Sequence, residues 1–253
     1  MTQHYKFVAA GATDVGRRRN MNEDALFVSD DLLIVCDGMG GHDNGEVASA
    51  LTVETLVKSW IESDRSGNSL VKAIVAANKM VTEWALDMKS DMGTTLNVSA
   101  LVTQSTKPRL VNINIGDSQA RIASKKSDWD EFKMFASELH NAPRSSSAIT
   151  RFIPSGWYGP PNPLIDWIKD SYHRISLEDK IIRLAMFSDG YGDYHYNDAL
   201  EIIDEIIGDV SDEYKEDWTE EELTEGCQEA IQWANDCGGK DNITMILAQV
   251  VSI

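Results

Sequence analysis

Aspartates recur along this chain at points where a predicted strand meets a glycine-containing turn. The segments are LLIVCDGMGG, NINIGDSQA, AMFSDGYGD and GGKDNIT, and their acids are Asp37, Asp117, Asp189 and Asp241. A single Asp-Gly pair is an ordinary turn signal. Repetition at several strand ends is a stronger constraint, because neighbouring strands can bring their terminal acids together. We therefore expect a sheet-based fold with carboxylates gathered over one edge.

The hydrophobic pattern between these acids predicts an α+β fold. Strands are expected over 5–11, 25–28, 32–36, 94–102, 109–115, 118–123, 131–136, 181–187 and in the C-terminal NITMILAQVV. Apolar residues at helical spacing predict helices that include 53–61, 74–88, 197–208 and 219–236. Runs of strands combined with paired helices favour sheets packed on each other with helices outside.

The strand expected over 109–115 alternates Val111, Ile113 and Ile115 with Asn112 and Asn114. Alternation of apolar and polar residues is typical of a strand with one face in the core. This strand is therefore expected to bury one face only.

We expect a single domain over residues 1–253. No Pro/Ser-rich linker, repeat or low-complexity tract interrupts the chain, and its 42% hydrophobic content is ordinary for a globular protein. Residues 140–163 hold several prolines, a serine run, Trp157 and Tyr158, without periodicity. Long irregular loops in compact domains are often functional, so this excursion is a candidate functional loop.

Charge and cysteine usage exclude several classes of protein. The formal net charge of −18 argues against nucleic acid or anionic membrane as main partner, since both are polyanions that bind clustered Lys and Arg. No run is long enough for a membrane-spanning helix, and the N-terminus does not have the pattern of a signal peptide. The three cysteines lack CxxC spacing, which fits a reduced cytoplasmic protein.

Converging carboxylates need compensation, because like charges in one place cost free energy unless protons or a cation neutralise them. Glu23 and Asp24, directly before the ALFV strand, add to the acids above. The set offers oxygen ligands without a Cys or His cluster, and hard ions such as Mg²⁺ and Mn²⁺ prefer oxygen. Glycine near the acids allows close backbone approach and leaves a carbonyl available as a ligand. These residues therefore predict Mg²⁺ or Mn²⁺ rather than zinc.

The motifs RRRNMNEDALFV, VCDGMGG, MGTTL, NIGDSQARIA, FSDGYGD and GGKDNITMIL, in this order, resemble the metal-dependent serine/threonine protein phosphatases of the type 2C, or PPM, family in its compact bacterial form. The matching segments run from about Gly11 to Val251. The resemblance implies an α+β fold in four layers, a central β-sandwich of two antiparallel sheets flanked by pairs of helices. It also implies two metal ions at one end of the sandwich, and a third metal site that binds more weakly.

Position within the motifs implies the role of each ligand. The implied metal ligands are Glu23, Asp24, Asp37, Gly38, Asp117, Asp189, Asp193 and Asp241. By resemblance, Asp37 bridges both metals and the carbonyl of Gly38 lies on the second. Asp189 and Asp241 complete the first metal.

The remaining implied roles concern water, the third metal and the substrate. By resemblance, Glu23 and Asp24 hold water molecules around the metals, and Asp117 with Asp193 forms the weaker third site. Arg19, four residues before Glu23, matches the arginine that binds the substrate phosphate. The implied catalytic residues are thus Arg19, Asp37, Asp189 and Asp241.

The chain departs from the family pattern in two places. Met39 stands where many eukaryotic members have a histidine proposed to protonate the leaving oxygen. His42 is a candidate for that role or a surface residue, and a water on the metal is the alternative donor. The flap-like segment near 138–180 keeps His140 without its preceding aspartate and otherwise diverges, which affects substrate choice and third-metal binding.

The leading hypothesis is a protein phosphatase that hydrolyses phosphoserine and phosphothreonine by direct attack of a water activated by two metal ions. Its expected partners are phosphoproteins, with an opposing serine/threonine kinase, and we expect a monomer. The alternative is a non-catalytic phosphatase-like regulatory or adaptor module. A nucleotide-binding loop at GMGG is disfavoured, because it has neither GxGxxG spacing nor a Gly-Lys-Ser/Thr ending.

Overall fold

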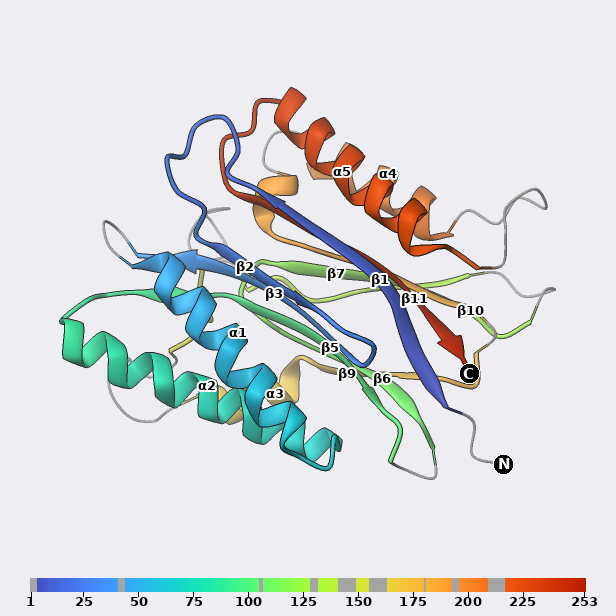
Figure 1. The fold of residues 1–253 in the computed structure, drawn as a ribbon, viewed down its shortest axis with the longest axis horizontal. Helices are drawn as coiled ribbons and strands as arrows, with labels where there is room; N and C mark the ends of the chain where they lie inside the picture. The colour runs from blue at the N-terminus through green and yellow to red at the C-terminus, as the bar shows by residue number, and fades with distance from the viewer. Residues whose placement is uncertain are drawn as a thin grey trace.

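The computed structural model describes residues 4–40, 44–104, 107–127, 132–140, 149–154, 163–179, 181–192, 196–208 and 217–253. Its strands form two sheets in which every neighbouring pair is antiparallel (Figure 1). Sheet A has the order β1 (Tyr5–Asp14), β11 (Ile243–Ser252), β10 (Ile181–Phe187), β7 (Gln119–Lys125), β8 (Lys133–Ala136). Sheet B has the order β2 (Asp24–Val28), β3 (Leu32–Met39), β5 (Leu96–Val102), β6 (Arg109–Ile115), β9 (Tyr172–Ser176), with β4 (Gly93–Thr94) beside β3.

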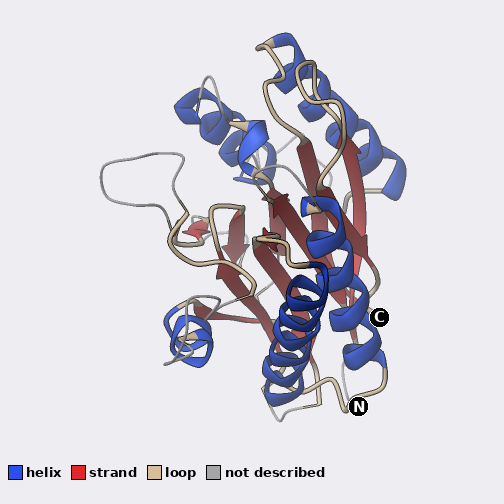
Figure 2. Ribbon diagram, turned by 90° about the vertical axis from the view of Figure 1, so that its left-hand side faces the viewer, coloured by secondary structure: helices blue, strands red, loops and turns tan. Residues whose placement is uncertain are grey.

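Helices cover the outer faces of the two sheets. The helices are α1 (Gly45–Ile61), α2 (Gly67–Met88), α3 (Leu164–Asp170), α4 (Tyr196–Gly208) and α5 (Glu220–Asp236), with a short 3₁₀ turn, η1 (Asp189–Tyr191). α1 and α2 lie on the side of sheet B, and α4 and α5 lie on the side of sheet A (Figure 1). Figure 2 shows the strands at the centre of the molecule with helices around them. The expected four-layer α+β sandwich is therefore confirmed.

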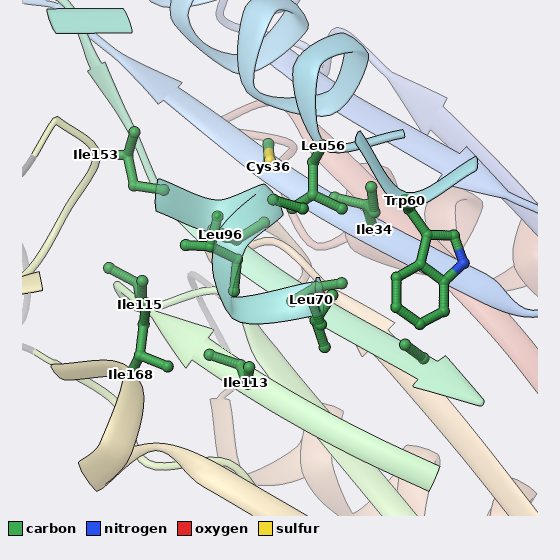
Figure 3. Close-up of a cluster of buried hydrophobic side chains, with 14 of the residues drawn as sticks. Ile34, Cys36, Leu56, Trp60, Leu70, Leu96, Ile113, Ile115, Ile153 and Ile168 are labelled. Carbon is green, nitrogen blue, oxygen red and sulfur yellow. The ribbon is translucent and has the colours of Figure 1, made fainter. Parts of the chain in front are cut away.

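The buried side chains form layers that match this arrangement. One cluster joins α1 and α2 to sheet B and includes Ile34, Leu56, Trp60 and Leu96 (Figure 3). A second lies between the sheets, and a third lies between sheet A and helices α4 and α5. Burial of apolar surface on both sides of each sheet is the main stabilising contribution in such a fold. It holds the strand ends, and the acids on them, in fixed positions.

The expectation that the 109–115 strand buries one face only is wrong. Asn112 and Asn114 are buried, and so are the apolar residues that alternate with them, Val111, Ile113 and Ile115. Their side chains lie against Asn97 of β5: Asn97 Nδ2 donates to Asn114 Oδ1 at 2.8 Å, and Asn112 Nδ2 donates to Asn97 Oδ1 at 2.9 Å. Amides can be buried where they satisfy one another in this way, so a polar alternation does not require a solvent face.

The expected irregular excursion over 140–163 falls partly outside the described residues, and Trp157 and Tyr158 are among those not described. Within the described part, Ile153 pairs through its backbone with Thr94 of β4. Helix α3 and strand β9, which follow, were not predicted from the sequence. None of the helices in the described part of the chain is both long and apolar enough to cross a membrane.

Candidate active site

The first pair of acids lies on adjacent strands. Asp24 opens β2 and is the cross-strand neighbour of Asp37 on β3. β3 continues through Asp37 to Met39, so this acid lies within a strand rather than after its end. Like charges directly opposite each other on a sheet are destabilising. The pairing therefore indicates a site that a proton or a cation must neutralise.

Asp189 and Asp241, at strand ends of sheet A, lie at the same end of the sandwich as Asp24 and Asp37. Asp189 begins the η1 turn after β10, and Asp241 stands two residues before β11. The antiparallel pairing of β10 with β11 continues as a hydrogen bond from Ser188 N to Thr244 O at 3.1 Å, which holds the two acids side by side. Acids from both sheets thus meet at one end of the sandwich, as the sequence pattern predicts.

Burial and mutual repulsion raise the pKa values of these carboxyl groups. The pKa of Asp37 is raised well above its usual value, first by burial and then by the charges of Asp24, Asp189 and Asp241. The pKa of Asp24 is raised to about 6, first by burial, against the opposing hydrogen bonds from Thr244 and Ser188. Without a cation, the cluster is therefore stabilised by holding protons.

A chain of hydroxyl groups fixes Asp24. Its Oδ2 accepts hydrogen bonds from Thr244 Oγ1 at 2.6 Å and Ser188 Oγ at 2.8 Å. Thr244 Oγ1 lies 2.7 Å from Thr13 Oγ1, which in turn accepts from Asn22 Nδ2 at 2.9 Å. The other oxygen, Oδ1, is buried and has no hydrogen-bond partner. Ser188 is therefore a positioning residue beside the acids, not an activated nucleophile.

Gly38 occupies a position that no other residue can take without a shift of the backbone. A Cβ there would overlap the carbonyl oxygens of Gly45 and Glu23. The amide of Gly38 also donates to Glu23 O at 3.1 Å, and Ser49 Oγ donates to the same oxygen at 2.6 Å. The glycine lets β3 approach both the start of α1 and the segment before β2.

Arg19 lies at the solvent side of the cluster. Its Nη2 donates to Asp241 Oδ2 at 2.6 Å, and its side chain is 48% exposed. Glu23 lies nearby: its pKa is raised by burial, lowered by Arg19, and raised by Glu46 and Asp241. Half exposure leaves the guanidinium accessible to an incoming anion, and its planar fork suits a phosphate.

Two residues have roles that the sequence did not reveal. Glu46, in the first turn of α1, lies close enough to Glu23 to raise its pKa, and Oε2 of Glu46 is buried without a partner. Asn242 fixes the segment before β2: its Oδ1 accepts from Glu23 N at 2.8 Å, and its Nδ2 donates to Val15 O and Met21 O. The GEVAS segment that follows the glycine-rich turn was the available signal for Glu46.

Asp117 lies in the buried turn between β6 and β7. The next residue, Ser118, is 2.6 Å from Thr95 through their hydroxyl oxygens, and Thr95 Oγ1 accepts from Asp37 N at 2.9 Å. His140 stabilises the same turn, because its Nδ1 accepts a hydrogen bond from Gly116 N at 3.1 Å. The turn that carries Asp117 is thus linked to the backbone of Asp37 through Ser118 and Thr95.

Two further candidates, Asp193 and His42, lie outside the described residues. Met39 and Cys36 lie inside them. Cys36 is buried in β3 with a raised thiol pKa, caused first by burial, as for an unreactive core residue.

A divalent cation fits this site by chemistry. Its donors are oxygen atoms, and buried oxygens of Asp24 and Glu46 have no hydrogen-bond partner. The pKa of Asp37 is raised first by burial and then by the charges of three neighbouring aspartates, which a cation would offset. Across the described ranges, however, no three His, Cys, Asp or Glu side chains are already arranged around a common point. Binding would therefore require small rotations of carboxylates that already adjoin one another.

The raised pKa values predict how stability depends on pH. A carboxyl group whose pKa is raised on folding stabilises the folded state fully below about pH 4, and this contribution is lost as the pH rises through about 6 for Asp24. The melting temperature measured in chelator is therefore expected to fall between about pH 4 and 6. Saturating Mn²⁺ at the upper pH should restore it, because binding to the folded state adds stability.

The matched control for this series is the Asp37→Asn variant, because an amide cannot ionise. Its melting temperature should vary less with pH than that of the wild type. A wild-type melting temperature that is unaffected by Mn²⁺ at neutral pH would contradict the assignment of these acids to a cation site.

Comparison with known proteins adds an independent line of observation. A model of the family described as Protein phosphatase 2C matches residues 16–226. Serine/threonine protein phosphatase PstP of Mycobacterium tuberculosis is 28% identical over 254 residues, which cover 96% of this chain and 45% of that protein. A putative protein phosphatase 2C-type of Streptococcus pyogenes is 28% identical over 260 residues, covering 93% and 94% of the two chains. This chain therefore spans less than half the length of the mycobacterial relative.

Solved structures share the fold. The catalytic domain of PstP in complex with two manganese ions superimposes with a TM-score of 0.72 at 23% identity, covering 98% of this chain and all of that one. A crystal structure of a bacterial serine phosphatase gives a TM-score of 0.67 at 25% identity, covering 95% and 96%. Similarity over nearly the whole of each chain establishes the same architecture of sheets and helices.

Proposed function

This chain belongs to the protein phosphatase 2C family, and on that premise we propose that it hydrolyses phosphoserine and phosphothreonine in proteins with the help of Mn²⁺ or Mg²⁺. The observation that carries the proposal is the meeting of Asp24, Asp37, Asp189 and Asp241, from both sheets, at one end of the sandwich. The names of the relatives support the substrate class.

In this proposal, Asp37 and the carbonyl of Gly38 hold the cations together with Asp189 and Asp241. The cations, when bound, supply the acidity that activates water for in-line attack on phosphorus and offsets charge on the phosphoryl oxygens. The residues of the chain orient this chemistry. The hydroxyl chain through Thr244 fixes Asp24, and the tight packing around Gly38 fixes the backbone that carries Asp37.

The polar residues around the centre complete the proposed site. Glu23 and Asp24 hold water within it, and Asp117 with Asp193 forms a weaker third cation site. Met39, at the end of β3, has no proton to give to the leaving serine oxygen, which needs one because an alkoxide leaves poorly. We assign that proton to solvent at the site.

Arg19 is proposed to bind the substrate phosphate. It now pairs with Asp241, so an arriving phosphate would compete for a guanidinium that is already directed at the site. The Arg19→Ala variant is expected to raise KM by about 10- to 100-fold with a smaller effect on kcat, since a charge-assisted hydrogen bond is worth about 1.5–3 kcal/mol.

Arg18→Ala is the matched control, because Arg18 is exposed and forms no ion pair with the described residues. Steady-state kinetics on a phosphothreonine peptide measure both variants. An unchanged KM in Arg19→Ala would remove Arg19 from the phosphate site.

The experiment that tests the function is release of phosphate by the purified protein from phosphoserine and phosphothreonine peptides and from an aryl phosphate. Turnover should require Mn²⁺ or Mg²⁺ and stop with chelator. Absence of turnover from all three substrates with either cation would overturn the proposal and favour a non-catalytic adaptor module.

A further inference from the structure

A groove runs along the edge of sheet B between β2 and α1. Its volume is about 680 Å³, and its lining includes Ala25, Leu26, Phe27, Ala50, Val53 and Val57. These walls are apolar, whereas Glu54, Lys58 and Glu62 lie along the helix side of the groove. All five residues of β2 are partly exposed, as expected for a strand at the edge of a sheet. The groove therefore combines an apolar surface with an accessible strand.

The hydrogen-bond pattern shows which main-chain groups of β2 point outward. Gly38 N donates to Glu23 O at one end of the β2–β3 pair, and Ser29 N donates to Leu32 O at the other. In an antiparallel pair, alternate residues direct their N–H and C=O groups toward the neighbouring strand. The main-chain N–H and C=O groups of Ala25 and Phe27 therefore point toward β3, and those of Leu26 and Val28 point away from it. Within the described part of the chain, no other segment hydrogen-bonds to these outward groups.

Edge strands in soluble proteins are usually protected by lysine, proline, a bulge or a covering segment. The strand DALFV has no lysine or proline, and its only charge is Asp24 at the end nearest the acids. An apolar edge of this kind is a template for pairing with another extended chain.

One end of the groove, at Ala25, lies one residue along β2 from Asp24 of the candidate active site. β2 starts at Asp24, the cross-strand neighbour of Asp37, and α1 starts at Gly45, in close contact with Gly38. From there both elements run away from the acids, with Ala50, Val53 and Val57 at successive turns of the helix. The groove therefore extends away from the acids along both β2 and α1.

We propose that this groove binds an extended segment of the phosphoprotein substrate, which adds to β2 as a further strand while its phosphorylated residue lies at the acids. The proposal rests on the proposed function and specifies its substrate: an unstructured segment next to the phosphorylated residue. Main-chain bonds to Leu26 and Val28 hold the segment, and every second side chain packs against Val53 and Val57. The net charge of −18 favours segments with basic rather than acidic residues.

The length of β2 sets the length of the segment. β2 extends about 16 Å, at about 3.3 Å per residue, and Asp24 at its start belongs to the site. The four residues Ala25–Val28 therefore pair with about four residues on one side of the phosphorylated residue. Longer extensions, or extensions on the other side of the phosphorylated residue, should not increase kcat/KM further.

The test measures kcat/KM with Mn²⁺ for an aryl phosphate and for phosphothreonine peptides that carry two, four or six residues on the N-terminal or the C-terminal side. For the wild type, kcat/KM should rise by about tenfold or more in one series only and level off near four residues. Ala50→Trp, at an exposed groove position, should lose this gain and keep its aryl phosphate turnover. Val75→Trp, 39% exposed on α2, is the control and should keep both.

N-methylation of single peptide bonds gives a second readout that is specific for strand addition. Methyl groups at alternate positions should abolish the gain, because only alternate amides face β2, and methyl groups between them should have little effect. Loss at every position or at none would overturn strand pairing.

The possible outcomes distinguish failure of the groove proposal from failure of the proposed phosphatase function. Turnover of the aryl phosphate without any gain from extension, or an equal gain in Ala50→Trp, would overturn the groove proposal alone. A wild-type dimer in light scattering that Ala50→Trp dissociates, without a gain from extension, would assign the groove to a second copy and overturn it as well. Absence of aryl phosphate turnover would overturn the proposed function and the groove proposal together.

Discussion

Replacement of Asp37 by asparagine is expected to abolish metal-dependent phosphate release, with kcat/KM lower by about 1,000-fold or more. Asp37 adjoins Asp24, Asp189 and Asp241, so its charge acts on every part of the proposed cation site. Asparagine keeps the shape of the side chain and removes that charge. Calorimetric titration with Mn²⁺ should show correspondingly weaker binding.

The same variant should fold normally. The raised pKa of Asp37 means that the metal-free protein favours the neutral carboxyl group, and an amide is likewise neutral. In chelator, Asp37→Asn is therefore expected to melt at or above the wild-type temperature, which separates loss of function from loss of structure. Asp87→Asn, at an exposed position on α2, is the control and should change neither activity nor stability. Near-wild-type turnover of Asp37→Asn with saturating Mn²⁺ would contradict its assignment.

The second large effect is expected from Gly38→Ala. The added Cβ would overlap two carbonyl oxygens, those of Gly45 and Glu23, and neither belongs to a flexible side chain. The backbone of β3 must therefore separate from α1 or from the segment before β2. We expect a loss of about 3 kcal/mol in the free energy of unfolding, at the upper end of the range for overpacked sites, together with loss of turnover.

Gly208→Ala is the matched control, because a Cβ at that position meets only Met134 Sδ at 3.7 Å, an ordinary contact. Urea denaturation measured by circular dichroism reports the stability of both variants. A Gly38→Ala variant with wild-type stability and turnover would show that close packing around this glycine is not what places Asp37.

Much of the site follows from local sequence. The acid of VCDGMGG and the acid that precedes ALFV are predicted to lie together because each adjoins a hydrophobic strand, and the structure places Asp24 directly opposite Asp37. Residues that act through contacts distant in the sequence were harder to identify. Glu46 faces Glu23 only because α1 packs beside Gly38, and no periodic pattern encodes that contact.

The sequence-based prediction of a solvent-facing side for the 109–115 strand was wrong because buried polar side chains hydrogen-bond to one another. Asn112 and Asn114 alternate with apolar residues, and the same alternation describes a solvent-facing strand and one that carries a buried amide network. Only the positions of Asn97 on the neighbouring strand β5, and of Ser137 just after β8 of the other sheet, distinguish the two cases. Short elements such as α3 and β9 were missed because five to seven residues carry too little periodicity to predict a helix or a strand.

The most direct measurement of the central claim is anomalous diffraction from crystals of this protein soaked in Mn²⁺. We expect two manganese peaks at the end of the sandwich where the acids of both sheets meet, with Asp37 in contact with both and with Asp189 and Asp241 on one of them. Absence of manganese from this position, with the carboxylates of Asp37, Asp189 and Asp241 directed apart, would contradict it.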